Sequence, residues 1–371
     1  RIVVRDVVVG EVWLCAGEAN MEFEVDDASR PQSRVNNAAA EVAAAHYPLI
    51  RQFKVALQPA NHPMETLRGD WKVCSPETVG GFTAVGYFFA RDLFTRLNVP
   101  FGIIDSACAG TPVECWMSPV ALAGFPGISI GRAAADGPWV PGAAFNGMIH
   151  PLLQYAIRGA IWYQGESDVG HAAGYASLFP KMITSWRAHF GQGDFPFFWV
   201  QLANVDLPGE GPGEPWVYLR EAQSGALSLP STGQAVAIDV GDLKDVRARN
   251  KQEVGRRLAL LAKAKVYAIP VVYSGPAYRE IAVEGSSIRV RFSFAGDGLT
   301  ASGRPLQSFE VAGADRVFHR AAAIIQGDSV VVRSPAVAQP VAVRYAWRNA
   351  PAANLYNGAG LPAAPFRSDN W

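Results

Sequence analysis

Short apolar runs alternate with amphipathic segments along the first two-thirds of the chain. The runs typical of buried strands are Val12–Cys15, Leu49–Val55, Phe101–Ala107, Ile157–Tyr163, Phe197–Leu202 and Gln234–Asp239, with a weaker opening strand at Ile2–Val9. Apolar residues at helical spacing predict helices over Thr83–Leu97, Tyr175–Phe190, Tyr218–Leu227 and Lys251–Lys265. Strands that alternate with helices predict an α/β fold built on a parallel, doubly wound sheet.

The pattern changes after residue 268. Short strands separated by turns are predicted at Val271–Tyr273, Ile281–Glu284, Ile288–Phe294, Phe309–Val311, Ala323–Gln326, Val330–Arg333 and Val341–Ala346. We therefore expect two domains, an α/β domain over 1–268 and a small antiparallel β-rich unit over 269–371 packed on it. The Gly-, Pro- and Ala-rich stretch Gly127–Ala144 is expected to form an irregular loop over the ligand-binding edge of the sheet.

Composition excludes several classes of function. The 371 residues carry 33 basic and 33 acidic side chains, so neither nucleic acid nor an anionic membrane is expected as a partner. No apolar run approaches the roughly 18–20 residues of a membrane span, and no secretory signal follows Arg1, which suggests a mature, trimmed or excised chain. Metal-ligand spacing is absent, so no metal or cofactor is predicted. The cysteines are expected as buried thiols, with a disulfide as the alternative in an exported protein: Cys15, Cys74, Cys108 and Cys115.

Polar, glycine-bearing loops follow the predicted strands. They lie at Ala19, at Gly110, at Gln164–Glu166 and at Asp242–Arg247. Because parallel sheets bind ligands at the carboxyl ends of their strands, these four loops are expected to converge. Acyl transfer needs a nucleophile, a base, an orienting acid and donors for the oxyanion. The N–H of residue 19, the N–H of Gly110 and the side chain of Gln164 are candidate donors, although the glycines could serve turn geometry alone.

The sequence of these loops resembles one family throughout. The first loop reads GEANM over 17–21 and the second AGTPVECW over 109–116. The third combines FNGMIHPL from residue 145 with WYQGES from residue 162, and the fourth combines DVR from residue 245 with NKQEVGRRLAL from residue 250. Together with the final segment, from VRYAW at residues 343–347 to SDNW at residues 368–371, these motifs resemble the SGNH-hydrolase carbohydrate esterases of the sialate O-acetylesterase-like group. The resemblance implies a three-layer α/β/α sandwich that removes acetyl groups from sialic acid or from plant polysaccharides such as xylan and xyloglucan.

Two positions depart from the family pattern. Ala19 stands where the family has its nucleophilic serine, and Arg247 stands where it has its histidine base. Alanine has no nucleophilic atom, and arginine stays protonated near neutral pH. The resemblance implies that Asp245 would orient the histidine, with Asp242 as a second candidate. Other histidines (His150, His171 and His189) do not lie at the base position and are expected to be structural or exposed.

Further residues of these motifs are candidates for substrate contact. Glu18, where the family has glutamine, could bind a cation or a sugar hydroxyl, and Trp116 and Trp162 could form a sugar platform, with core packing as the alternative. The complete set of predicted substrate-binding residues is Glu18, Asn20, Thr111, Trp116, Asn146 and Glu166, of which Asn146 and Glu166 could instead hold loops.

Two interpretations follow from the sequence. The chain is either a carbohydrate O-acetylesterase disabled by substitution, or a natural pseudoenzyme that acts as a carbohydrate-binding module. The family's usual substrates imply export to the periplasm or the cell exterior. Acetylated carbohydrate is the expected partner, and no pattern in the chain indicates an oligomeric state.

Overall fold

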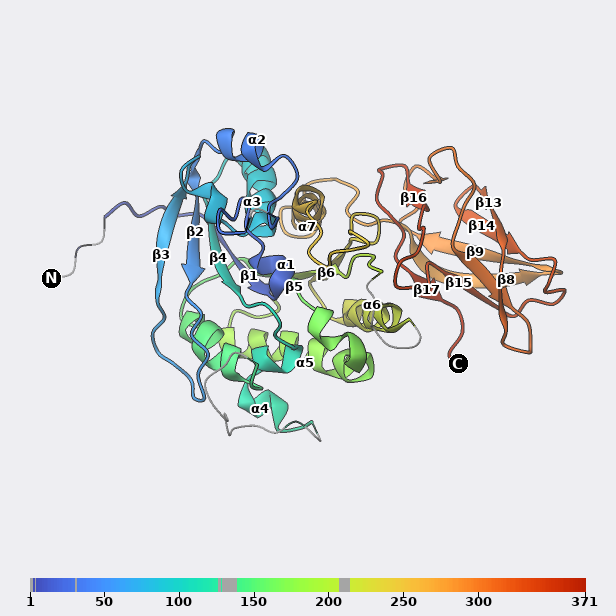
Figure 1. The fold of residues 1–371 in the computed structure, drawn as a ribbon, viewed down its shortest axis with the longest axis horizontal. Coiled ribbons are helices and arrows are strands. Elements are labelled where there is room, and N and C mark those ends of the chain that lie inside the picture. The colour runs from blue at the N-terminus through green and yellow to red at the C-terminus, as the bar shows by residue number, and fades with distance from the viewer. Residues whose placement is uncertain (1–2, 4, 31, 126–127, 129–138, 207–213) are drawn as a thin grey trace.

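A seven-stranded sheet forms the centre of the larger part of the molecule (Figure 1). The computed structural model describes residues 3, 5–30, 32–125, 128, 139–206 and 214–371. The strand order is β3-β2-β4-β1-β5-β6-β7, and only β3 runs antiparallel to its neighbour. The strands are β1 (Glu11–Gly17), β2 (Tyr47–Val55), β3 (Gly69–Cys74), β4 (Phe101–Ala107), β5 (Gly159–Tyr163), β6 (Phe197–Gln201) and β7 (Thr232–Val236).

Helices cover both faces of this sheet, as the alternating pattern predicts. The helices α3 and α7 pack together on one face, and α5 and α6 pack together on the other (Figure 1). The central strand β1 is buried on both sides, which explains its uninterrupted apolar run. The bounds are α1 (Ala19–Glu22), α2 (Ala38–Ala43), α3 (Ala84–Leu97), α4 (Pro119–Leu122), α5 (Ala172–Phe190), α6 (Pro215–Gly225) and α7 (Lys251–Lys265). The three-layer α/β/α architecture is confirmed.

The C-terminal region is a separate antiparallel β unit with its own apolar cluster. Two four-stranded sheets, ordered β12-β11-β15-β17 and β13-β14-β9-β8, enclose that cluster. Their strands are β8 (Ala277–Glu284), β9 (Ser287–Ser293), β11 (Phe309–Ala312), β12 (Phe318–Arg320), β13 (Ala322–Gln326), β14 (Ser329–Arg333), β15 (Ala342–Tyr345) and β17 (Phe366–Arg367), with β10 (Leu299–Thr300) and β16 (Tyr356–Asn357) paired alongside. The β-rich tail is confirmed, while the domain boundary at residue 268 stays a prediction.

A buried arginine joins the two parts. The Arg220 guanidinium on α6 donates to the carbonyl oxygens of Leu202 and Ala203 in the α/β part, at 2.9 and 2.6 Å. It also donates to the carbonyl oxygens of Arg348 and Asn349 beside the β unit, at 2.8 and 2.9 Å. One side chain therefore donates hydrogen bonds to carbonyl oxygens on both sides of the interface between the two parts, which helps to fix how they meet.

Some predicted elements differ in the structure. The described residues of the stretch Ile2–Val9 form no strand and are exposed, because β3 rather than this stretch extends the sheet beyond β2. The stretch Val271–Tyr273 also pairs with no strand. The strand β3 escapes prediction because its pattern of exposure has no apolar alternation. Most of Gly127–Ala144 lies outside the described residues, so the predicted loop there stays a prediction.

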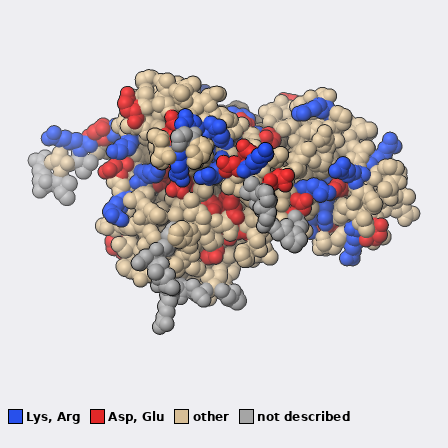
Figure 2. Space-filling model, viewed as in Figure 1, with Lys and Arg blue, Asp and Glu red and all other residues tan. Residues whose placement is uncertain are grey.

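Surface charge and cysteine state agree with the composition. Figure 2 shows basic and acidic side chains intermixed over the face that it draws. No helix in the described part of the chain has both the length and the apolar character to cross a bilayer. All four cysteines are buried free thiols, which confirms the first of the two expectations for them.

Candidate functional site

The strand β1 ends in a tight turn that places Ala19 at the start of α1. Gly17 has φ of 139°, and a Cβ added there would lie only 2.1 Å from the carbonyl oxygen of Tyr163. Only glycine fits this conformation and this close approach. The Glu18 N–H donates to the same carbonyl oxygen at 2.9 Å, which fixes the turn against β5. Since Ala19 is half-buried and is the first residue of α1, its N–H has no acceptor within the helix and can serve a ligand.

The second loop lies directly beside this turn. The Cys108 N–H donates to the Gly17 carbonyl oxygen at 3.0 Å, and the Ala109 N–H donates to a carboxylate oxygen of Glu22 on α1 at 3.0 Å. Gly110 follows with φ of 74° and is exposed. The amides of residues 19 and 110 thus belong to adjoining loops at one edge of the sheet, as predicted.

Thr111 and Trp116 support this loop from below. The Thr111 hydroxyl donates to the Cys108 carbonyl oxygen at 2.7 Å and accepts the Trp116 indole N–H at 2.9 Å. Both side chains are 0% exposed, and Trp162, which packs edge-on against Trp116, is also fully buried. The prediction that Thr111 and Trp116 contact substrate, and that the two tryptophans form a sugar platform, is therefore wrong; these side chains hold the loop.

Gln164 is committed to the protein rather than to an oxyanion. Its side-chain amide donates to the Thr111 carbonyl oxygen at 3.2 Å and to the Asp168 carboxylate, which uses both N–H groups. Asp168 in turn accepts the backbone N–H of Val113 at 3.0 Å. Burial raises the pKa of the Asp168 carboxyl to about 7. The prediction of Gln164 as an oxyanion donor is corrected, because no donor of its buried side chain is free.

The Glu18 carboxylate ties the first loop to the third. One oxygen accepts the N–H of Gly165 at 2.9 Å and that of Ser167 at 3.2 Å, and the other accepts the Ser167 hydroxyl at 2.6 Å. The side chain is 1% exposed. These three donors occupy the carboxylate, so the predicted contact of Glu18 with a cation or a sugar hydroxyl is wrong.

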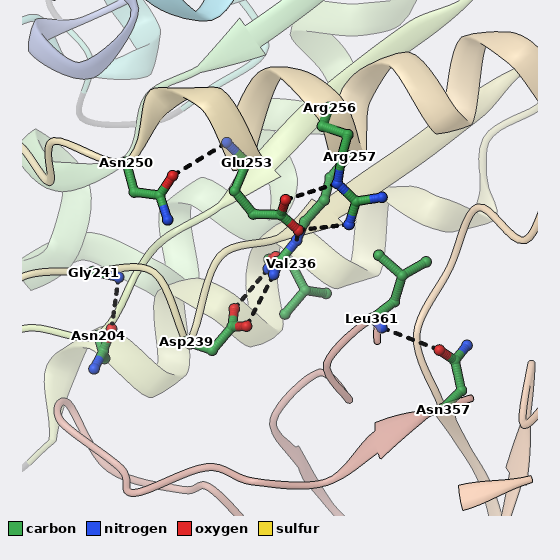
Figure 3. Close-up of polar contacts among 10 residues, drawn as sticks. All are labelled: Asn204, Val236, Asp239, Gly241, Asn250, Glu253, Arg256, Arg257, Asn357 and Leu361. Carbon is green, nitrogen blue, oxygen red and sulfur yellow. Dashed lines mark hydrogen bonds and ion pairs between the residues drawn. The ribbon is translucent and has the colours of Figure 1, made fainter. Parts of the chain in front are cut away.

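The fourth loop is held at both ends (Figure 3). At its start, the Asn204 side chain accepts the Gly241 N–H at 3.0 Å, and Arg257 on α7 forms a bidentate ion pair with Asp239. At its end, the Asn250 side chain caps α7 by accepting the Glu253 N–H at 3.3 Å. The segment between these anchors carries Asp245 and Arg247.

Asn20 joins this fourth loop to the first and the third. Its Nδ2 donates to the Val246 carbonyl oxygen at 2.8 Å and to Glu166 Oε1 at 2.5 Å, while its Oδ1 accepts from the ammonium of Lys251. Asn20 and Lys251 are 0% exposed. Asn20 therefore holds loops instead of contacting substrate, which corrects its predicted role, and Glu166 shares that loop-holding contact.

Two ionisable groups in this network are strongly perturbed. Burial, followed by the nearby charge of Glu18, raises the pKa of Glu166 well above its usual range. Burial lowers the pKa of Lys251 to about 7, although the charge of Glu166 opposes that shift. Both shifts follow from placing charge beneath the loops, away from water.

Asp245 and Arg247 lie at the surface of the site. One Asp245 carboxylate oxygen accepts the Arg247 backbone N–H at 2.8 Å and lies 3.7 Å from its guanidinium. The two side chains are 44% and 34% exposed, so this ion pair is loose and solvated. Asp242 is exposed and accepts the Lys244 N–H at 2.9 Å, and its role as the second candidate acid stays a prediction.

The remaining candidates lie outside this centre. The Asn146 side chain donates to the Ala60 carbonyl oxygen at 3.2 Å from within a π-helical turn over Phe145–Ile149, so it holds a loop, the alternative already open for it. His150 and His189 each bond a backbone carbonyl outside the four loops, and His171 is exposed. Among the residues that the structure describes, no group of acidic, histidine or cysteine side chains could hold a metal ion.

Sequence reasoning missed three residues of the site. Lys251 and Asp168 each hold a loop through a buried contact and Ser167 through a partly buried one, yet none of them is among the predicted site residues. A signal for Lys251 existed: a lysine in the first turn of a helix opposes the helix dipole and needs another reason to be there.

Comparisons with known proteins identify the family of this chain. A family model described as "Carbohydrate esterase, sialic acid-specific acetylesterase" matches residues 9–263. Human sialate O-acetylesterase is 33% identical over 71% of this chain, which spans only 55% of that protein, and the mouse sialate O-acetylesterase is 28% identical over 98% of this chain and 78% of its own length. A solved carbohydrate acetylesterase from Xanthomonas citri is 42% identical, with a TM-score of 0.91 over 99% of this chain and 82% of its own. The chain therefore belongs to the carbohydrate esterase family of sialic acid-specific acetylesterases.

Proposed function

We propose that this chain is built as a carbohydrate O-acetylesterase and that, with Ala19 and Arg247 in place, it binds acetylated carbohydrate without hydrolysing it. The observation that carries the proposal is the position of these two residues. Ala19 opens α1 with a free backbone N–H, and Arg247 lies on the loop that Asn20 fastens to α1. The sites of nucleophile and base are thus adjacent, and neither residue can do the chemistry.

The proposed parent reaction has two steps. A serine at position 19 would attack the acetyl carbonyl while a histidine at position 247 takes its proton, and Asp245 would orient that histidine. The backbone N–H groups of residues 19 and 110 would stabilise the oxyanion. Collapse of the intermediate passes the proton to the departing sugar oxygen and leaves an acetyl-enzyme, which water then hydrolyses to acetate by the same proton route.

The chain as written lacks the atoms for the first step. Alanine at position 19 offers only a methyl group to the carbonyl, and an arginine side chain at position 247 has donors but no acceptor for the proton of a nucleophile. Loss of nucleophile or base in a serine hydrolase costs roughly 10⁶-fold in turnover. The oxyanion donors are backbone groups, so they survive both substitutions and can still bind an acetyl oxygen.

Turnover of p-nitrophenyl acetate tests the proposal. We expect none above background from the chain as written, and a gain of at least about 10³-fold from Ala19→Ser combined with Arg247→His. The single substitutions are the matched controls and should each stay silent. Robust turnover by the unaltered chain would overturn the claim of an inactive site, and a folded but silent double variant would overturn the claim of a disabled esterase.

A natural pseudoenzyme that binds glycans is the second candidate. The joint loss of both reactive residues favours it, because once Ala19 has replaced the nucleophile nothing maintains a base at position 247. Calorimetric titration with acetylated and chemically deacetylated xylo-oligosaccharides, and with O-acetylated and free sialic acid, would test it. We expect binding that depends on the acetyl group, and equal affinity for the deacetylated sugars would contradict this candidate. The proposed place of binding is outside the cytoplasm, where such glycans occur.

A further inference from the structure

The Asn20 side chain bonds to three separate parts of the site at once. Its Nδ2 donates to Val246 in the fourth loop and to Glu166 in the third, and its Oδ1 accepts from Lys251 at the start of α7. Since Asn20 directly follows residue 19, these bonds act on the turn that carries the nucleophile position. Since Val246 directly precedes residue 247, they act equally on the loop that carries the base position.

Lys251 decides how the Asn20 amide is oriented. When Lys251 is protonated, its ammonium group can only donate, while the Val246 carbonyl oxygen can only accept, so the two together fix which end of the Asn20 amide faces which partner. Rotating the amide by half a turn would set Nδ2 against the ammonium and the oxygen against the acceptors on Val246 and Glu166. Every bond of the amide would then be lost inside the protein, where an unpaired polar group is costly.

The surroundings of Lys251 suit this single task. The side chain is 0% exposed, and its Nζ lies 4.8 and 5.3 Å from the ring centroids of Phe23 and Tyr163. Within the described part of the chain no carboxylate lies at ion-pair distance from it. Aromatic faces hold the cation in place without competing for its N–H groups, which leaves the Asn20 oxygen as its directed acceptor.

We propose that Lys251 and Asn20 are positioning residues that set the separation between residue 19 and residue 247. The inference rests on the proposed function for its catalytic meaning, because neither side chain touches the reacting atoms. It assigns to the pair a role that neither the motif nor the fold alone requires: Lys251 orients Asn20, and Asn20 fixes the Val246 carbonyl and hence the base loop.

Hydrogen exchange in the chain as written tests the positioning without any chemistry. We expect Lys251→Met and Asn20→Ala to accelerate amide exchange over residues 242–249 by about tenfold or more, while exchange in α3 stays unchanged. Lys251→Gln retains a donor for Asn20 and should restore much of the protection. Lys263→Met is the matched control, because it removes a lysine of the same helix that pairs with Asp92 on α3 and makes no hydrogen bond or ion pair with the four loops among the described residues. Unchanged exchange in both test variants would overturn the proposal.

Kinetics in the Ala19→Ser, Arg247→His background supply the second test. Displacing a base by about 1 Å costs up to about 10²-fold, so adding Asn20→Ala should lower kcat by about 10- to 100-fold and leave KM within about twofold. A rise in KM with unchanged kcat would overturn a positioning role. If the background variant itself is silent, the proposed function fails, and the exchange experiment still decides whether Lys251 and Asn20 hold the loop.

Discussion

The buried part of the site and its surface differ in how their side chains are held. Beneath the strand ends, Glu18, Asn20 and Gln164 are fully buried, and their side chains hold three neighbouring loops. At the surface, Ala19 contributes only its backbone and Arg247 forms a loose, exposed ion pair. The buried side chains that hold the loops are therefore different residues from the two to which the proposed function assigns reactivity. Under that proposal, substitutions at the surface remove the chemistry while the buried part of the site keeps its shape.

The largest effect is expected at the turn below Ala19. Gly17→Ala places a Cβ 2.1 Å from a carbonyl oxygen and at a φ of 139°, so strain and overpacking together should cost about 4 kcal/mol of unfolding free energy. Urea denaturation measures it. Gly191→Ala is the control: its φ is 63° but no atom lies within 4 Å, so it should cost about 1 kcal/mol. Equal losses of unfolding free energy in the two variants would contradict the claim that the turn at Gly17 is tightly packed.

The next largest effect is expected at Asp168, a buried carboxyl group in the network that holds the loops. Asp168→Ala leaves the Gln164 amide and the Val113 N–H without their acceptor, which should cost about 2–4 kcal/mol. Thermal and urea unfolding both measure this loss. Asp242→Ala, at an exposed carboxylate of the fourth loop, should change stability by less than about 0.5 kcal/mol. A loss below 1 kcal/mol for Asp168→Ala would mean that the buried network is dispensable.

The pH dependence of stability should have two limbs with opposite slopes. The folded pKa of Asp168, about 7, exceeds its ordinary 3.8, so its contribution is complete below about pH 4 and is lost as pH rises to 7. The folded pKa of Lys251, about 7, lies below its ordinary 10.5, so its contribution is complete above about pH 10 and is lost as pH falls to 7. Unfolding free energies from pH 4 to 10 should therefore flatten on the acid side in Asp168→Asn and on the alkaline side in Lys251→Met.

The smallest effect is expected at the surface. Arg247→Ala removes an ion pair whose closest approach is 3.7 Å between partly exposed groups, so stability should change by less than about 1 kcal/mol. Differential scanning calorimetry compares it with the unaltered chain. A loss as large as that of Asp168→Ala would show that Arg247 belongs to the supporting network after all.

The alternation of strands and helices was predictable because each element carries its own periodicity. The range predicted for α7, Lys251–Lys265, is the range observed. The edge strand β3 was not, since an exposed strand such as Gly69–Cys74 needs no apolar face. Strand β3 pairs antiparallel with β2, the strand directly before it, across the connection of residues 56–68, which is too long to carry the sequence signal of a tight hairpin turn.

The candidate site was likewise predictable only in part. The four loops could be placed from the sequence because parallel strands bring their carboxyl ends together. The roles of side chains could not, since a motif does not say whether a polar group faces solvent or core. Trp116 and Gln164 were therefore assigned to ligands although both are fully buried, and Lys251, which is also fully buried, was not singled out.

Arg220 has a consequence for the integrity of the molecule. Its guanidinium donates to carbonyl groups of both parts at once, so a buried non-covalent contact joins the parts in addition to the peptide connection through residues 269–276. A protease that cut this connection would leave two fragments still associated. Expressed as separate polypeptides, the α/β body and the β unit should accordingly assemble as a heterodimer.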